Sequence, residues 1–415
     1  MRTDVTIIGA GQAGLAMSHC LTEDGIDHVV VERGSTANAW RTERWDSLRL
    51  LTPNWMSRLP GFQYQGSDPE GYMTASEVGD YLDRYRASFD APVHDETSVD
   101  QVTPTDNGFE VETSGGRIDS RSVVIATGAC GSPHIPAVAA DFPTQTRHLS
   151  PIHYRNPDEI EGPVLVVGAS ASGAQIADEL ARAGHNVTVA VSNHVRLPRR
   201  YRGMDIHWWL EKLGILDEHI SDVDDPLKAR RTPSLQLVGS PEGRDLGLNE
   251  LQSSGVRVAG RLAGVADTTV QFSGSLANVI HSADLKQNRL LDRCDEYAEA
   301  SGLTHELVAA HRPAATSVEA LPLTAHTGDF ATVIWATGFR PSYPYLPEHF
   351  LDAKGGLPQN EGVTDQRGLF ILGTTFGTRR NSSFLDGVGR DAAALAGSIR
   401  CDLERQLSAS AFGGR

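Results

Sequence analysis

Two glycine-rich turns, each placed directly after a run of apolar residues, constrain the fold of this chain more than any other feature. The first turn spans residues 9–14 and reads GAGQAG, and the second spans residues 168–173 and reads GASASG. A buried strand, a tight turn and a helix start point backbone N–H groups and the positive helix end at a pyrophosphate. Two such units predict an α/β chain with two Rossmann-like dinucleotide-binding domains.

The first unit has every part of a dinucleotide-binding motif. An apolar strand at 5–8 precedes the turn, a helix is expected over about 14–24, and a second strand covers 28–31. Glu32 ends that strand about 20 residues after the turn, where an acid binds a ribose 2′-hydroxyl. The expected cofactor contacts of this unit are Gly9, Gly11, Gln12, Ala13, Gly14, Glu32 and Arg33.

The second unit departs from the motif in two places. Ser170 replaces the middle glycine, and its hydroxyl either binds phosphate or caps the following helix. After the strand at 187–191 the acid is absent, and arginines at 196, 199 and 200 favour a 2′-phosphate, unless they are solvated loop charges. The expected contacts here are Gly168, Ser170, Ser172, Gly173, Gln175, Ser192 and Arg196.

Three further apolar runs end in small residues. The runs at 123–128 and 333–338 both finish in Ala-Thr-Gly, and a late run at 369–373 finishes in glycine. Small residues after a strand permit a close approach of another backbone or a ligand. The cofactor-side residues expected at these ends are Ala126, Thr127, Gly128, Ala336, Thr337, Gly338 and Gly373.

Composition excludes several classes of function. The net charge of −16 argues against a nucleic-acid surface, which needs clustered Lys and Arg. The four cysteines lie far apart without CxxC or metal-ligand spacing, so we expect no metal site and no dithiol chemistry. No run of 18 apolar residues and no signal peptide are visible, which predicts a cytoplasmic protein without a membrane partner.

The chain resembles the class B flavin-dependent monooxygenases, a family that includes flavin-containing and YUCCA-like monooxygenases. The resemblance rests on the two turns, the two Ala-Thr-Gly ends, the strand at 368–373, and segments at 40–61 and 154–157. It implies that the first turn binds FAD, with Trp40 and Arg41 beside it, and that the second binds NADPH. The implied NADPH domain covers 156–325, with a helical insertion around 205–310, and interrupts an FAD domain of 1–155 and 326–415.

The resemblance also implies a reaction. NADPH reduces FAD, O2 then forms a C4a-(hydro)peroxyflavin, and one oxygen atom passes to a small organic substrate, preferentially at nitrogen or sulfur. The family fingerprint that precedes the second turn is altered here, because Ser150 stands where its histidine is expected. His148 and His153 are substitutes, or the stretch is only a linker. This alteration disfavours Baeyer–Villiger chemistry on a carbonyl, and oxidative decarboxylation of a 2-oxo acid stays open.

Three residues are candidates for contact with the reacting atoms. By the resemblance, Asn54 matches an active-site asparagine that hydrogen-bonds the flavin adduct, and a turn asparagine is the alternative. Arg379 and Arg380 precede a last helix expected over about 385–405, with residues 381–383 as its caps. These arginines stabilise reduced flavin, contact substrate, or pair with surface acids.

Two other functions compete with oxygenation. One is an NADPH:acceptor oxidoreductase or an oxidase that forms no stable oxygenating adduct. The other is a flavoprotein fold kept for nucleotide sensing or partner binding. The reaction partners that we expect are a small-molecule substrate and O2, and the sequence leaves room for a homodimer.

Overall fold

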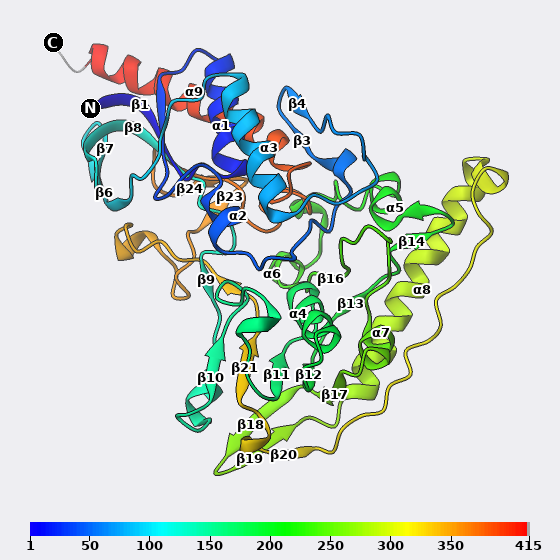
Figure 1. The fold of residues 1–415 in the computed structure, drawn as a ribbon. Helices are drawn as coiled ribbons and strands as arrows, with labels where there is room; N and C mark the ends of the chain where they lie inside the picture. The colour runs from blue at the N-terminus through cyan, green and yellow to red at the C-terminus, as the bar shows by residue number, and fades with distance from the viewer. Residues whose placement is uncertain (413–415) are drawn as a thin grey trace.

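The computed structural model describes residues 1–412 as backbone and residues 1–406 with their side chains. Two sheets dominate the chain, and Figure 1 shows the first in its upper part and the second in its lower part. The first sheet has the order β23-β24-β25-β8-β1-β2-β5, and β6 and β7 extend it beside β8. Its strands are β23 (Gln359–Asn360), β24 (Val363–Thr364), β25 (Leu369–Ile371), β8 (Gly116–Ile125), β1 (Arg2–Ile8), β2 (His28–Val31), β5 (Val93–His94), β6 (Val99–Thr105) and β7 (Gly108–Thr113).

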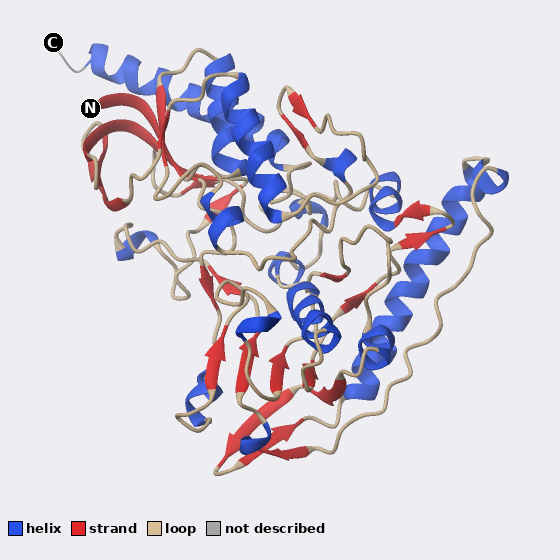
Figure 2. Ribbon diagram, in the orientation of Figure 1, coloured by secondary structure: helices blue, strands red, loops and turns tan. Residues whose placement is uncertain are grey.

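Parallel pairing buries the centre of the first sheet. β1 pairs in parallel with both β2 and β8, and Ile7 has no exposed surface. Burying one such side chain is worth about 1.5–3 kcal/mol. Helices α1 (Gln12–Glu23), α3 (Ala75–Ser88) and α9 (Val388–Phe412) contribute to one core cluster with β1. Figure 2 shows these helices grouped together against the upper strands.

The second sheet repeats this plan. Its five parallel strands are β10 (Arg147–Leu149), β21 (Thr332–Trp335), β11 (Val164–Val167), β12 (Val187–Val191) and β17 (Arg257–Gly260), in that order. Helices α4 (Ala171–Arg182) and α7 (Leu248–Ser253) pack on one face, and a small sheet of β18 (Leu262–Ala266), β19 (Thr269–Phe272) and β20 (Thr324–His326) lies on the other. The prediction of two dinucleotide-binding units is therefore confirmed at the level of the fold.

The chain crosses between the sheets twice, through one short antiparallel pair. β9 (Ser132–Pro133) pairs with β22 (Phe339–Arg340), and each follows an Ala-Thr-Gly strand end. The expected domain limits at 155 and 326 are therefore misplaced, because β10 and β21 both belong to the second sheet. The crossings lie close to residues 132 and 340 instead.

Helix predictions held where apolar periodicity was strong. Apolar residues at helical spacing over 276–301 predict a packed helix or a helix pair, and the structure has the single helix α8 (Leu276–Ala300) there. The last helix is α9, which begins at Val388. The predicted caps at residues 381–383 are wrong, because these residues lie in turns before α9. Ser382 instead accepts hydrogen bonds from the N–H groups of Thr378 and Arg379, at 3.0 and 2.8 Å.

The expected helical insertion contains strands as well as helices. Besides α8 it holds α5 (Ile206–Lys212), α6 (Pro226–Arg230) and the short strand β16 (Leu235–Gln236), which pairs with β13 (Val195–Arg196). A strap of residues 303–320 returns along α8, as Figure 1 shows. Among the described residues, no helix is long and apolar enough to cross a membrane.

A buried ionic network ties the inserted region to the first domain. Arg199 has no exposed surface and donates to Asp205 at 2.6 Å, to His207 at 2.9 Å and to the carbonyl of Leu51 at 2.9 Å. Tyr72 donates to the other oxygen of Asp205 at 2.7 Å. Burial opposes ionisation, yet hydrogen bonding with His207, whose backbone N–H donates to the carboxylate, and the charge of Arg199 hold the pKa of the Asp205 carboxyl well below its usual value.

Asp205→Asn removes the charge that compensates Arg199, and we expect a free energy of unfolding lower by about 3 kcal/mol at pH 7. Because the folded-state pKa of Asp205 is depressed, its contribution is present above about pH 3.9 and is lost as the pH falls through the folded-state value. The two proteins therefore converge in stability only in acid. Thermal denaturation across pH measures this.

The matched control for that measurement is Asp402→Asn. Asp402 pairs with Arg367 on the surface of α9, and the Arg367 side chain is 59% exposed. Removing such a pair costs about 0–1 kcal/mol. Equal destabilisation by the two variants at pH 7 would contradict the role of the buried network.

Candidate cofactor and active site

Three glycines shape the first turn. Gly9 adopts a φ of +105°, and a Cβ there would lie 2.8 Å from the carbonyl oxygen of Ala126. A Cβ on Gly14 would overlap the carbonyl of Gly9, so only glycine lets α1 pack this closely on the strand ends. A Cβ on Gly11, by contrast, would meet no atom within 4 Å. Gly11 therefore borders open space at the start of α1.

The start of α1 fits the phosphates of a dinucleotide. Gly11 is the N-cap residue and no side chain caps the helix. The first N–H groups of a helix have no partner within it, and they carry the positive end of the helix dipole. An anion in the space beside Gly11 would satisfy these donors. This cradle is the arrangement that the sequence predicted.

Glu32 lies at the end of β2, beside this turn. It is 8% exposed, accepts a hydrogen bond from the N–H of Ala10 at 2.8 Å and receives a longer one from Gly34 at 3.3 Å. The backbone thus fixes the carboxylate next to the cradle. Its position suits a ribose hydroxyl. The two N–H donors that hold the carboxylate, those of Ala10 and Gly34, could not be predicted from the sequence.

Gln12 joins three distant segments at the first turn. Its side-chain nitrogen donates to the carbonyl of Ser383 at 3.2 Å, and its oxygen accepts from Trp40 at 3.2 Å. The glycine after β25 also lies here, since a Cβ on Gly373 would be 2.7 Å from the Cβ of Ala13. The structure therefore brings Gln12, Ala13, Trp40 and Gly373 together, as expected.

The second turn has the same backbone geometry. Gly168 adopts a φ of +107°, and a Cβ there would overlap the carbonyl of Ala336. Ser170 occupies the N-cap of α4 with φ −78° and ψ −170°, close to the −82° and −170° of Gly11. Serine is unstrained in this conformation. Its hydroxyl makes no capping bond, so the capping alternative is not observed.

The remaining Ala-Thr-Gly residues lie where each chain crossing begins. Gly128 and Gly338 both adopt positive φ, +80° and +89°, directly after their strands. Thr337 donates its hydroxyl to the carbonyl of His134, across the β9–β22 pair. Thr127 precedes Gly128 in the corresponding place of the first sheet.

A segment that the sequence did not single out covers the second turn. Gln236, fully buried in β16, donates to the carbonyl of Ala169 at 2.6 Å. Gln175 in α4 donates to the carbonyl of Leu237 at 2.8 Å. Gln175 therefore holds this segment, and its amide is already engaged. No sequence signal links residues 236 and 169.

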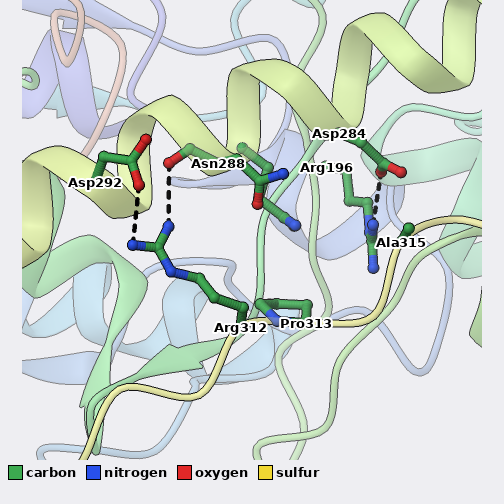
Figure 3. Close-up of a pocket in the computed structure, with 8 residues that line it drawn as sticks. Arg196, Asp284, Asn288, Asp292, Arg312, Pro313 and Ala315 are labelled. Carbon is green, nitrogen blue, oxygen red and sulfur yellow. Dashed lines mark hydrogen bonds and ion pairs between the residues drawn. The ribbon is translucent and has the colours of Figure 1, made fainter.

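Arg196 lines a pocket of about 500 Å³ between β13, α8 and the strap, shown in Figure 3. It is 7% exposed, pairs with Asp284 at 2.6 Å and donates to the carbonyl of Ala314 at 2.7 Å. Burial opposes ionisation, but hydrogen bonds from Thr316 and Arg196 hold the pKa of the Asp284 carboxyl below its usual value. The paired guanidinium is thus partly neutralised.

The other residues of this region divide between buried and exposed positions. Arg199 belongs to the buried network and does not face a 2′-phosphate site, whereas Arg200 is exposed. Ser192, at the end of β12, is half-buried, and its carbonyl is 3.1 Å from a ring nitrogen of His194. Gln287 lines the same pocket as Arg196, and its side-chain oxygen has no partner among the described residues.

The amide of Asn54 serves the backbone. The side chain is 4% exposed, its nitrogen donates to the carbonyl of Asp68 at 2.9 Å, and its oxygen accepts from the N–H of Met73 at 2.7 Å. These bonds fit the alternative of a turn asparagine. One N–H of the amide stays unassigned by these contacts, so contact with the flavin remains a prediction.

The candidate arginines all have acidic partners. Arg379 pairs with Asp391 at 3.1 Å, and Arg380 pairs with Glu218 and lies 5.0 Å from the ring centre of Phe376. The two arginines near the first turn are engaged likewise, Arg33 with Glu43 and Arg41 with Asp80 and Asp83 of α3. The ion-pair alternative is therefore observed for all four arginines, and their contact with cofactor or substrate stays a prediction.

The residues near the expected fingerprint histidine contact other protein groups. Ser150 is fully buried and its hydroxyl is 2.9 Å from a ring nitrogen of His153. His148 accepts a hydrogen bond from Trp335 at 2.9 Å and stacks on that ring, and burial lowers its pKa. The contacts of His148 are thus structural ones within the second domain.

Comparison with known proteins agrees with this geometry. The family described as pyridine nucleotide-disulphide oxidoreductase matches residues 6–211. An oxidoreductase CzcO-like protein of Geobacillus kaustophilus is 32% identical over 400 residues, covering 95% of this chain and 98% of the relative. The indole-3-pyruvate monooxygenase YUCCA4 of Oryza sativa subsp. japonica is 29% identical over 422 residues, covering 95% of this chain and 86% of that protein.

Solved structures share the fold. A flavin-containing monooxygenase from Stenotrophomonas maltophilia superposes with a TM-score of 0.68 at 21% identity, covering 96% of this chain and 98% of that one. The two glycine turns, the paired sheets and the full-length relatives lead to one conclusion. The chain belongs to the class B flavin-dependent monooxygenases and is an oxidoreductase that uses FAD and NADPH.

Proposed function

We propose that this monooxygenase oxygenates a nitrogen or sulfur atom of a small organic molecule. The observation that carries the proposal is the pair of equivalent glycine turns on two sheets joined by β9 and β22. Such a pair lets one dinucleotide pass electrons to another. Bound FAD supplies hydride acceptance from NADPH and the activation of O2, and the protein supplies binding, orientation and exclusion of water.

The two turns bind different dinucleotides in this proposal. The N–H groups at the start of α1 hold the pyrophosphate of FAD, and Glu32 accepts from its ribose. The start of α4 holds the pyrophosphate of NADPH, with the Ser170 hydroxyl in place of a close glycine contact. Arg196 and Ser192 are the residues proposed for the 2′-phosphate, and Arg196 takes it when Asp284 releases the guanidinium.

The choice of nitrogen or sulfur rests on the altered fingerprint. Ser150 replaces the histidine expected there, and His148 is engaged with Trp335. No histidine is therefore offered at that position for chemistry on a carbonyl. A second candidate is oxidative decarboxylation of a 2-oxo acid, supported by the name of the relative YUCCA4, an indole-3-pyruvate monooxygenase.

The location and assembly of the protein are secondary proposals. All four cysteines are free thiols, which suits the reducing cytoplasm. A homodimer stays a prediction, and sedimentation of the FAD-loaded protein measures it.

Anaerobic reduction by NADPH, followed by isotopically labelled O2 and a panel of substrates, tests the proposal. The panel contains an amine, a sulfide, a ketone and a 2-oxo acid. We expect labelled oxygen in the amine or sulfide product, with NADPH consumed in proportion. Labelled peroxide without labelled product would indicate an oxidase, and loss of CO2 from the oxo acid would favour the second candidate.

Gly11→Ala tests the first turn. A Cβ at Gly11 meets no protein atom within 4 Å, so the variant should fold normally. The methyl group enters the space proposed for the pyrophosphate, and we expect FAD affinity to fall about tenfold or more, equivalent to about 1.4 kcal/mol. Flavin absorbance of the purified protein and titration with FAD measure this.

Gly397→Ala is the matched control, because a Cβ there also meets no protein atom within 4 Å and the residue lies within α9. Alanine favours a helix interior over glycine, so its FAD content should match that of the wild type. A Gly11→Ala protein with full flavin content would contradict the assignment of the first turn.

Arg196→Ala and Asp284→Asn test the 2′-phosphate proposal in opposite directions. Loss of the guanidinium should raise the KM for NADPH about tenfold and leave the KM for NADH within about twofold. Loss of the Asp284 charge should lower the KM for NADPH, because the carboxylate no longer competes for Arg196. Equal effects on the two nucleotides would exclude this role.

A further inference from the structure

A segment of the inserted region lies antiparallel to the loop that precedes α9. The N–H of Ile220 donates to the carbonyl of Thr378 at 2.8 Å. In return, the N–H groups of Arg380 and Asn381 donate to the carbonyls of residues 218 and 216, each at 3.2 Å. A strand-like bridge between residues 219 and 379 completes the contact. Residues 216–220 therefore hold residues 378–381 through backbone bonds.

Ion pairs reinforce this contact, with the acidic residues on one side and the arginines on the other. Three acidic residues of the inserted region pair with arginines. Glu211 lies 3.2 Å from Arg58. Asp217 pairs with Arg390, and Glu218 pairs with Arg380. We call these three acidic residues and their three arginine partners the clasp. Every clasp acid lies on the inserted side, and every arginine lies on the side of the first domain. Single exposed pairs contribute little, so the backbone bonds and the pairs act together.

The held loop leads directly to the first glycine turn. Two residues beyond Asn381, the carbonyl of Ser383 accepts from the side-chain nitrogen of Gln12 at 3.2 Å. Gln12 is the first residue of α1, next to the cradle at Gly11. A continuous path of bonded groups therefore runs from the inserted region, through residues 378–383, to the turn that holds FAD.

The inserted side of the clasp is fixed independently. α5 begins directly after Asp205, whose carboxylate is tied to Arg199 and Tyr72 within the buried network. A pocket of about 510 Å³ adjoins the clasp, and Arg58, Glu211 and Asp217 are among the residues that line it. Clasp residues therefore border open space, whereas Asn381 and Ser382 of the loop are buried, each 1% exposed.

We propose that the clasp, and Glu218 above all, positions the loop 378–383 beside FAD and so sets the geometry of flavin reduction. The inference rests on the proposed function, since it presumes FAD at the first turn. Arg380 is then a positioning residue rather than a group that contacts substrate. The neutral variant Glu218→Gln should loosen the loop, whose backbone bonds remain, without removing a buried charge, because Glu218 is 36% exposed.

The test compares FAD-loaded wild type, Glu218→Gln and the control Asp402→Asn, which breaks the Arg367–Asp402 pair, whose two residues do not belong to the clasp. Anaerobic rapid mixing with NADPH gives the limiting rate of flavin reduction and its half-saturation. We expect Glu218→Gln to lower the limiting rate about fivefold with unchanged half-saturation, because reaction rates depend steeply on small displacements. Amide exchange should increase in the peptide that contains residues 378–383.

A charge exchange separates positioning from substrate contact. Arg380→Glu alone should slow flavin reduction, and the double variant Arg380→Glu with Glu218→Arg should recover at least about half of the lost rate. Failure of the exchange to restore the rate, or a Glu218→Gln protein reduced as fast as wild type, would overturn the inference. Wild-type protein that binds FAD but is not reduced by NADPH would contradict the proposed function instead.

Discussion

The whole structure depends on backbone contacts that only glycine permits at the two turns. Gly14 and Gly173 press their helices against the carbonyls of Gly9 and Gly168, where a Cβ would overlap the oxygen. Those carbonyls are aimed by nearly equal positive φ values of +105° and +107°. As a result, α1 and α4 start at equivalent places on their two sheets. The first N–H groups of each helix have no partner within that helix.

The two domains are tied together by interactions of different kinds. The chain crossings at β9 and β22 are covalent ties, and the Arg199 network is a buried ionic one. A buried pair is costly to break, because each charge loses its compensation. The clasp is more exposed and acts through backbone bonds as well as charges. The first two ties fix the inserted region, and the third transmits its position to the loop beside the first turn.

Much of the fold and part of the site could be predicted from the sequence. The strand at 28–31 and α8 were predicted correctly, because an apolar run and an apolar repeat are local signals. The caps at 381–383 were not, because Ser382 satisfies N–H groups of its own loop rather than of α9. The domain limits failed for a related reason: sheet membership of β10 depends on pairing with β21, far along the chain.

The sequence by itself determined the two nucleotide-binding units, their order and the glycines that shape them, because turn stereochemistry and apolar periodicity act over a few residues. Only the tertiary structure decided which arginines are available. Arg196 meets an acid 88 residues away and Arg380 meets one 162 residues away. Arg199 is enclosed by Asp205 and the backbone of Leu51. A guanidinium is chemically the same at all three positions, and its function depends on the charge that folding places beside it.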